Sequence, residues 1–234
     1  MVIGLLTITS IPTITGVAEA ISAQKKQNAA SKEQEKFNLT AMLARADDDD
    51  DGNDGTQGKW KETGFCVLRD GKAWLDLPGS PAKGHRFCGF YFKYPGEEGH
   101  LGLVGTASDE SPMLNWIYVN AETGRLEHGA RKDTLGHVIG PWGWSEDEAF
   151  LTLRRRRGGF VARRERESAD VVDDGAEGEE GWGVYWDPEQ KLLAAEEDDK
   201  DEDEDGVERC KPMLLRRRPL LGMESKYVRD EEKG

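Results

Sequence analysis

The spacing of turn residues between Lys59 and Leu193 most constrains what this chain can fold into. Short apolar or aromatic runs alternate there with Gly, Pro, Asn and Asp at intervals of roughly 8 to 15 residues. These residues break helices and favour tight turns, so long helices do not fit between them. The pattern predicts a mainly β, antiparallel domain, either a single β-barrel or a two-sheet sandwich.

Several segments predict a strand, a turn and a returning strand. In FCVLRDGKAWLDL, the Asp-Gly pair at 70–71 supplies the positive φ angles that a two-residue primed turn needs. LNWIYVNAETGRLEHG (114–129) and GWGVYWDPEQKLL (181–193) have the same form. AFLTLRRRR and FVARRERE, joined by Gly-Gly, predict a further hairpin. The three turn segments resemble one another weakly, which a meander or an internal repeat would produce, and we favour the meander.

The negative charge comes almost entirely from two tracts. Residues 47–54 and 196–208 hold 16 of the 46 acidic residues and one of the 32 basic ones, so the rest is close to neutral although the formal charge is −14. Such composition predicts disordered, solvated segments that discourage non-specific binding to nucleic acid or anionic membranes. A calcium loop starting at Asp47 would need a ligand at Gly58, so we expect a linker there.

The N-terminus has an apolar leader followed by a polar segment without Gly or Pro up to Ala46. The leader is short for a membrane span and contains Pro12, so we predict no transmembrane helix. We favour a helical arm that docks on an unknown protein or a membrane surface, in an intracellular protein that is cytoplasmic or nuclear. The alternative is a signal peptide over residues 1–20, which would imply secretion, although no basic residue precedes the apolar run.

These features divide the chain into four parts. They are an apolar leader and helical arm (1–46), an acidic linker (47–58), a β domain (59–193), and an acidic tract with a basic-apolar tail (194–234). The tail sequence CKPMLLRRRPLL predicts either a last strand or a docking peptide.

Four segments carry a resemblance to known proteins: TITGVAEAISAQKKQN, GFCVLRDGKAWLDLP, SDESPMLNWIYVNAETGRLEHG and HVIGPWGW. Together they resemble a group of uncharacterised proteins of filamentous fungi. The resemblance covers the N-terminal arm and most of the β domain. The group has no established activity, so the resemblance implies one domain with an apolar leader and no catalytic residue.

No motif predicts a catalytic, metal or cofactor site. Cys66, Cys88 and Cys210 are too few for a disulfide scaffold, and we expect buried thiols, with a Cys66–Cys88 disulfide as the alternative in a secreted chain. His85 and Cys88 have zinc-ligand spacing, but no second pair exists. The glycines at 99–105 lack dinucleotide-binding spacing. We therefore predict no cofactor and lean towards a protein that is not an enzyme.

The candidate contact residues are aromatic. Most of the seven tryptophans should fill a core. Trp142 and Trp144 of GPWGW are flanked by Gly and Pro, and we expect that they do not both fit on one strand face. They are our first ligand-contact candidates, together with Trp116 and Tyr118, which share a face of the segment 114–129.

A basic patch is predicted on the Gly-Gly hairpin. Its residues are Arg154, Arg155, Arg156, Arg157, Arg163 and Arg164. Such a stripe can bind phosphates of nucleic acid, yet the acidic tract at 196–208 would compete for it, so we do not expect nucleic acid as a partner.

The sequence thus favours a non-enzymatic interaction or ligand-binding β module of unknown partner. One alternative is a lipocalin-like small-molecule carrier, or an enzyme, that uses a barrel cavity. This alternative requires a polar-lined pocket inside residues 59–193. The other alternative is nucleic-acid binding through the arginine-rich hairpin, which would depend on salt.

Overall fold

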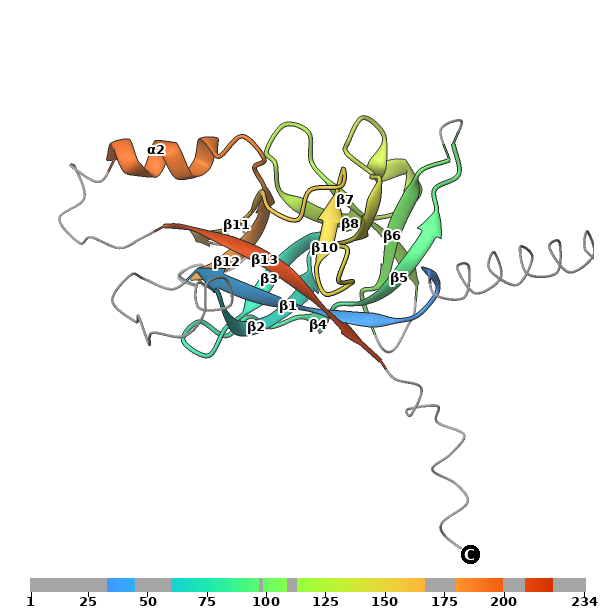
Figure 1. Cartoon of the computed structure of the whole chain (residues 1–234), viewed down its shortest axis with the longest axis horizontal. Helices are drawn as coiled ribbons and strands as arrows, with labels where there is room; N and C mark the ends of the chain where they lie inside the picture. The colour runs from blue at the N-terminus through green and yellow to red at the C-terminus, as the bar shows by residue number, and fades with distance from the viewer. Residues whose placement is uncertain are drawn as a thin grey trace, which may run out of the picture. The chain divides into compact units, whose positions relative to one another are not determined.

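The computed structural model describes residues 33–44, 60–96, 99–108, 113–166, 180–199 and 209–220 (Figure 1). Strands dominate these residues. In the first half of the chain they are β1 (Phe37–Ala44), β2 (Trp60–Arg69), β3 (Lys72–Asp76), β4 (His85–Arg86), β5 (Cys88–Lys93), β6 (Leu101–Thr106) and β7 (Leu114–Val119). The later elements are β8 (Leu126–Gly129), the 3₁₀ helix η1 (Arg131–Thr134), β9 (Trp142–Trp144), β10 (Leu151–Leu153), β11 (Phe160–Arg166), β12 (Glu180–Trp186), α2 (Lys191–Asp199) and β13 (Cys210–Pro219).

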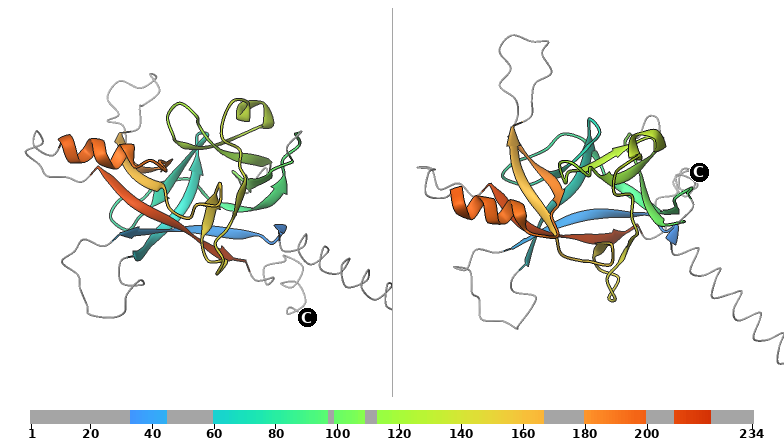
Figure 2. Two further views of the ribbon diagram at one scale, coloured as in Figure 1. Left: turned by 45° about the horizontal axis from the view of Figure 1, so that its top comes forward. Right: turned by 90° about the horizontal axis from the view of Figure 1, so that it is seen from above.

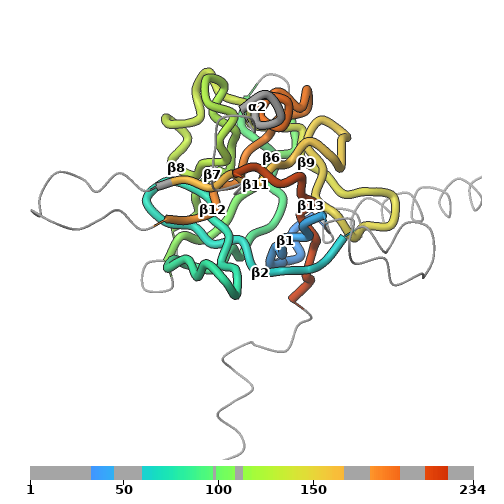
Figure 3. The backbone as a smooth tube through the Cα atoms, turned by 90° about the vertical axis from the view of Figure 1, so that its left-hand side faces the viewer, coloured from blue at the N-terminus to red at the C-terminus, as the bar shows by residue number. Residues whose placement is uncertain are grey.

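Eleven of these strands form one antiparallel sheet whose pairings close on themselves. The order is β12-β11-β13-β1-β5-β6-β7-β8-β3-β2-β4, with further pairings of β12 with β3 and of β1 with β2. Following the pairs from β1 through β2, β3, β12, β11 and β13 therefore leads back to β1, and Figure 3 shows strands of this circuit around the interior. The remaining strands, β9 and β10, form a separate two-stranded sheet. The predicted mainly β, antiparallel architecture is confirmed.

Turn chemistry accounts for the hairpins that were predicted correctly. Asp70 and Gly71 join β2 to β3 with φ angles of 50° and 75°, as a two-residue primed turn requires. Between β7 and β8, the side-chain oxygen of Asn120 accepts the backbone N–H groups of Glu122 and Thr123 at 3.0 and 3.3 Å. This side chain holds the turn in the way that asparagine commonly does.

The interior of the circuit is filled with apolar side chains. On β1, the buried side chains of Phe37, Leu39, Ala41 and Leu43 follow the two-residue period of a strand with one face inward. They belong to one cluster that also includes residues of β2, β3, β6, β7, β10, β11, β12 and β13. The core therefore depends on strands from both ends of the chain.

A buried ion pair lies on the outer face of the sheet. Arg125, 4% exposed, follows the β7–β8 turn and pairs with Glu165 of β11. Its guanidinium carbon lies 4.3 Å from the centre of the Trp74 ring, and it also donates to the Tyr185 hydroxyl at 3.2 Å. A Cβ atom at Gly183 would lie only 2.9 Å from this guanidinium, so the glycine makes room for it. The pair connects the β7–β8 hairpin to β11 and β12.

The prediction of a helix up to Ala46 was wrong over Phe37–Ala44, which form β1. This segment has helix-forming residues, but its seven-residue pairing with β13 and its apolar face override local propensity. Figure 2 shows β1 in blue beside β13 in red. The rest of the predicted arm (1–32) lies outside the described residues, as does the acidic linker 47–58. The sheet also extends beyond 59–193, because the C-terminal tail contributes β13 as a last strand.

Two further local predictions were wrong. The Gly-Gly hairpin does not form, because β10 pairs with β9 while β11 pairs with β12 and β13. The strand expected after Asp187 is the helix α2, whose Leu192 N–H donates to the Asp187 carboxylate at 2.7 Å, satisfying a helix N-terminal donor.

In the described part of the chain, no helix is long and apolar enough to cross a membrane.

Candidate functional site

The hairpin β9–β10 is anchored to the main sheet by a hydrogen bond and by contacts of the Trp144 ring. The Tyr91 hydroxyl donates to the Gly143 carbonyl at 2.6 Å. The Trp144 ring packs edge-on against Phe37, with centroids 4.5 Å apart, and lies 4.7 Å from the Tyr91 ring. The guanidinium carbon of Arg217 lies 4.7 Å from the centre of the same indole. These contacts hold the short hairpin in a defined position.

The two faces of this hairpin differ in character. Trp142 and Trp144 share the face that packs on the core, and the expectation that they cannot lie on one strand face was wrong. Trp142 is only 3% exposed. Gly143 and Thr152 are paired on the other face, where a Cβ at Gly143 would lie 3.2 Å from the Thr152 hydroxyl oxygen. A side chain at position 143 would therefore crowd the threonine hydroxyl.

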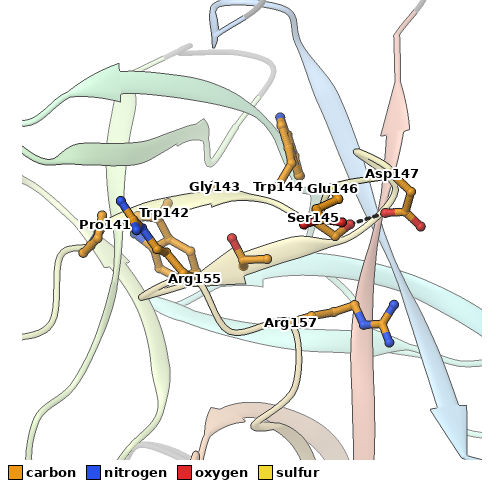
Figure 4. Close-up of a pocket in the computed structure, with 10 residues that line it drawn as sticks. Pro141, Trp142, Gly143, Trp144, Ser145, Glu146, Asp147, Arg155 and Arg157 are labelled. Atoms are coloured by element: carbon orange, nitrogen blue, oxygen red, sulfur yellow. Dashed lines mark hydrogen bonds between the residues drawn. The ribbon is translucent and has the colours of Figure 1, made fainter.

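An open pocket with a volume of about 920 Å³ lies at this hairpin (Figure 4). This volume is in the range of small-molecule sites. The lining residues are contributed by β9, by the turn before β10, by β10 and by the loop after it. They are Pro141, Trp142, Gly143, Trp144, Ser145, Glu146, Asp147, Thr152, Arg155 and Arg157. The pocket thus brings together Trp142 and Trp144 with two members of the predicted basic patch.

The turn after β10 holds Arg154 and Arg155 in an unusual conformation. Leu153 and Arg156 exchange backbone hydrogen bonds of 3.1 and 2.9 Å around it. The two central residues have φ angles of 51° and 63°, in the left-handed region that favours glycine and asparagine. Two arginines there carry backbone strain, and such strain concentrates at functional sites. The Arg154 N–H also donates to the Pro141 carbonyl at 2.8 Å, which places the turn beside the start of β9.

The charged groups of the pocket are engaged to different degrees. The Ser145 hydroxyl donates to Asp147, and this bond, the Ala149 N–H and the charge of Arg157 lower the pKa of the Asp147 carboxyl. The Arg157 guanidinium carbon also lies 5.3 Å from the centre of the Phe150 ring. Arg155 is exposed and forms no ion pair or hydrogen bond in the part of the chain that the structure describes.

The predicted basic patch is divided between two places. Arg154–Arg157 lie in the loop after β10, whereas Arg163 and Arg164 lie on β11. Arg164 pairs with Glu180 at 2.6 Å, and the Arg163 guanidinium carbon lies 5.8 Å from the centre of the Tyr185 ring. A continuous arginine stripe along one hairpin is therefore not formed.

Trp116 and Tyr118 lie elsewhere, on the face of β7 opposite to the core. Ile117 of the same strand belongs to the core cluster. The Trp116 ring packs against Tyr94 with centroids 4.9 Å apart, and Tyr118 stacks on His137 at 5.2 Å. The two residues share a face as predicted, but the structure does not bring them to the pocket at β9–β10. Their ligand contact stays a prediction.

The cysteines are free thiols in the structure. Cys66 is 1% exposed, and burial raises the pKa of its thiol to about 12, which makes it a poor nucleophile. The described residues contain no group of three or more His, Cys, Asp or Glu side chains that could hold a metal ion.

The polar residues of the pocket were not predicted from the sequence. Ser145, Asp147 and Thr152 are single polar residues beside very short strands, and no periodic pattern marks them. One local signal was present, because Ser-x-Asp sequences often form side-chain hydrogen-bonded turns, as this one does.

Comparison with known proteins agrees with this architecture. The family model of the fungal beta-trefoil domain matches residues 16–219, which is most of the chain. No curated protein and no solved structure matches. The match confirms the fungal part of the resemblance inferred from the sequence. This chain belongs to the fungal beta-trefoil domain family.

Proposed function

We propose that this chain is a non-catalytic binding domain and that the pocket at β9–β10 is its ligand site. Beta-trefoil domains are often used for binding, which is consistent with the proposal but does not locate a site. The main support for the proposal is the turn at Arg154 and Arg155. Both arginines have left-handed backbone angles that glycine would adopt without strain, and Arg155 lines the pocket.

The filled interior argues against the lipocalin-like alternative. We interpret the closed strand circuit as the small barrel expected from the sequence. The strands of this circuit contribute the fully buried side chains of Leu39, Leu75 and Phe160 to one core cluster. A carrier needs a cavity at that place. The pocket at β9–β10 lies instead at the separate two-stranded sheet, outside this strand circuit.

Docking of residues 1–32 on a partner, and an intracellular location, are further parts of the proposal that come from the sequence alone. N-terminal sequencing of the protein recovered from its cells tests both. An intact N-terminus supports the arm, whereas cleavage near Ala20 would contradict it.

Nuclear magnetic resonance of the whole chain tests the pocket. The probes are phenylacetate, phenyl phosphate and phenylacetamide, each with a small apolar ring. We expect at least one probe to shift the amide signals of Gly143, Ser145 and Thr152. Shifts confined to Trp116 and its neighbours, or none at the pocket, would contradict the proposal.

A matched pair of variants separates pocket filling from general damage. Gly143→Val places methyl groups over Thr152 and should abolish the shifts. Gly79→Val serves as the control, because a Cβ atom there meets nothing within 4 Å, and it should leave them unchanged. Equal effects of the two variants would argue against the assigned site.

A further inference from the structure

We propose that Arg155 recognises an oxyanion, a carboxylate or a phosphate, on the ligand of the β9–β10 pocket. This inference rests on the proposed function and adds the chemical class of the ligand. It assigns the recognition to one guanidinium among the several arginines of this loop.

The conformation of the turn brings Arg155 to the pocket. Arg154 and Arg155 both adopt left-handed backbone angles, at φ 51° and 63°. A turn of this type accommodates Asn-Gly or Gly-Gly without strain. Only Arg155 of the two lines the pocket, so the turn brings this residue, and not Arg154, to the pocket. A backbone that is already ordered need not be ordered on binding, which removes one part of the entropy cost.

The two arginines that line the pocket differ in their contacts. The Arg157 guanidinium carbon lies 5.3 Å from the centre of the Phe150 ring, and the Arg157 charge is a minor cause of the lowered pKa of the Asp147 carboxyl. Arg155 has no ring contact, ion pair or hydrogen bond within the described residues. Figure 4 shows Arg155 at the Trp142 end of the pocket and Glu146 at the other end, so the acidic residue does not neutralise it there. The Trp142 end of the pocket is therefore positively charged.

Apolar residues lie beside the turn that carries Arg155. The Arg154 N–H bond to the Pro141 carbonyl brings the turn next to Pro141, and Trp142 is paired with Leu153 immediately before the turn. Both Pro141 and Trp142 line the pocket, and they offer apolar atoms beside the positive charge. The planar fork of arginine matches two oxygens of a carboxylate or phosphate. The site thus fits a compact anion that carries an apolar group.

Calorimetric titration of three probes tests this assignment. Phenylacetate and phenyl phosphate carry the two kinds of oxyanion, and phenylacetamide is the neutral analogue of the first. We expect the wild-type protein to prefer the anions, and Arg155→Gln to weaken both by about tenfold without changing the affinity for the amide. The anion that binds with the higher affinity indicates whether the natural ligand carries a carboxylate or a phosphate.

Arg154→Gln is the matched control, because Arg154 belongs to the same turn and has the same charge but does not line the pocket. We expect it to leave all affinities within about twofold, and added salt to weaken only the anions. Two results would overturn the role of Arg155 while leaving the pocket as a binding site. One is an equal loss of anion affinity in the two variants, and the other is a wild-type affinity for phenylacetamide as high as that for phenylacetate. Failure of all three probes to bind would contradict the proposed function itself.

Discussion

Replacing the two strained arginines by glycine should stabilise this protein. A left-handed conformation is unfavourable by about 1–2 kcal/mol for a residue with a Cβ atom, and glycine loses about 0.5–1 kcal/mol in chain entropy on folding. The difference for Arg154→Gly or Arg155→Gly, at φ 51° and 63°, is a gain of about 0.5–1 kcal/mol each. The double variant should gain about 1–2 kcal/mol, and because the two residues are neighbours in one turn, its gain need not equal the sum of the single gains.

Urea unfolding followed by tryptophan fluorescence measures this gain as a higher midpoint at an unchanged slope. In a domain of this size the double variant should also melt about 2–8 °C higher. Gly71→Ala is the control of opposite sign, since Gly71 has φ 75° and the nearest atom to an added Cβ is 3.7 Å away. It should lose about 1 kcal/mol. Unchanged or lower stability of the glycine variants would refute the argument that this turn stores strain.

Three further predictions concern the core and the sheet. Glu165→Gln should lower the free energy of unfolding by about 3 kcal/mol, because it leaves the buried Arg125 without its counter-ion. Glu62→Gln, which alters a more exposed ion pair with Arg218, should lower it by about 0.5 kcal/mol, and urea unfolding measures both values. Tyr91→Phe, which removes the bond to Gly143, should lose about 1 kcal/mol in the same assay. Burial lowers the pKa of His128 below 6.5, so the unfolded chain binds more protons and stability falls as the pH drops from 6.5 towards the lowered pKa. His128→Gln should flatten that dependence in unfolding curves recorded at several pH values.

Local turn chemistry explains which hairpins were predictable. Asp70-Gly71 and the Asn120 turn are defined by residues adjacent in sequence, and both hairpins form as expected. β1 was not predictable, because its strand conformation depends on pairing with β13, more than 160 residues later in the sequence. Propensity within Phe37–Ala44 carries no information about that pairing.

The candidate site shows the same division. The sequence identified Trp142, Trp144 and the arginines as candidate contact residues, but the local structures predicted for them were wrong. Trp142 and Trp144 share a strand face after all, and the Gly-Gly hairpin does not form. Their meeting at one pocket follows from the pairing of β9 with β10, which joins Trp142 to Leu153 and so sets the turn at Arg155 beside Pro141. No local pattern indicates this pairing.

A crystal structure of the complex with phenyl phosphate or phenylacetate tests the central claim most directly. We predict that an oxyanion of the probe lies about 2.8 Å from the Arg155 guanidinium, with the ring against Pro141 and the edge of Trp142. A probe bound instead at the Trp116 face, or at Arg163 on β11, would contradict the assignment of the β9–β10 pocket as the binding site.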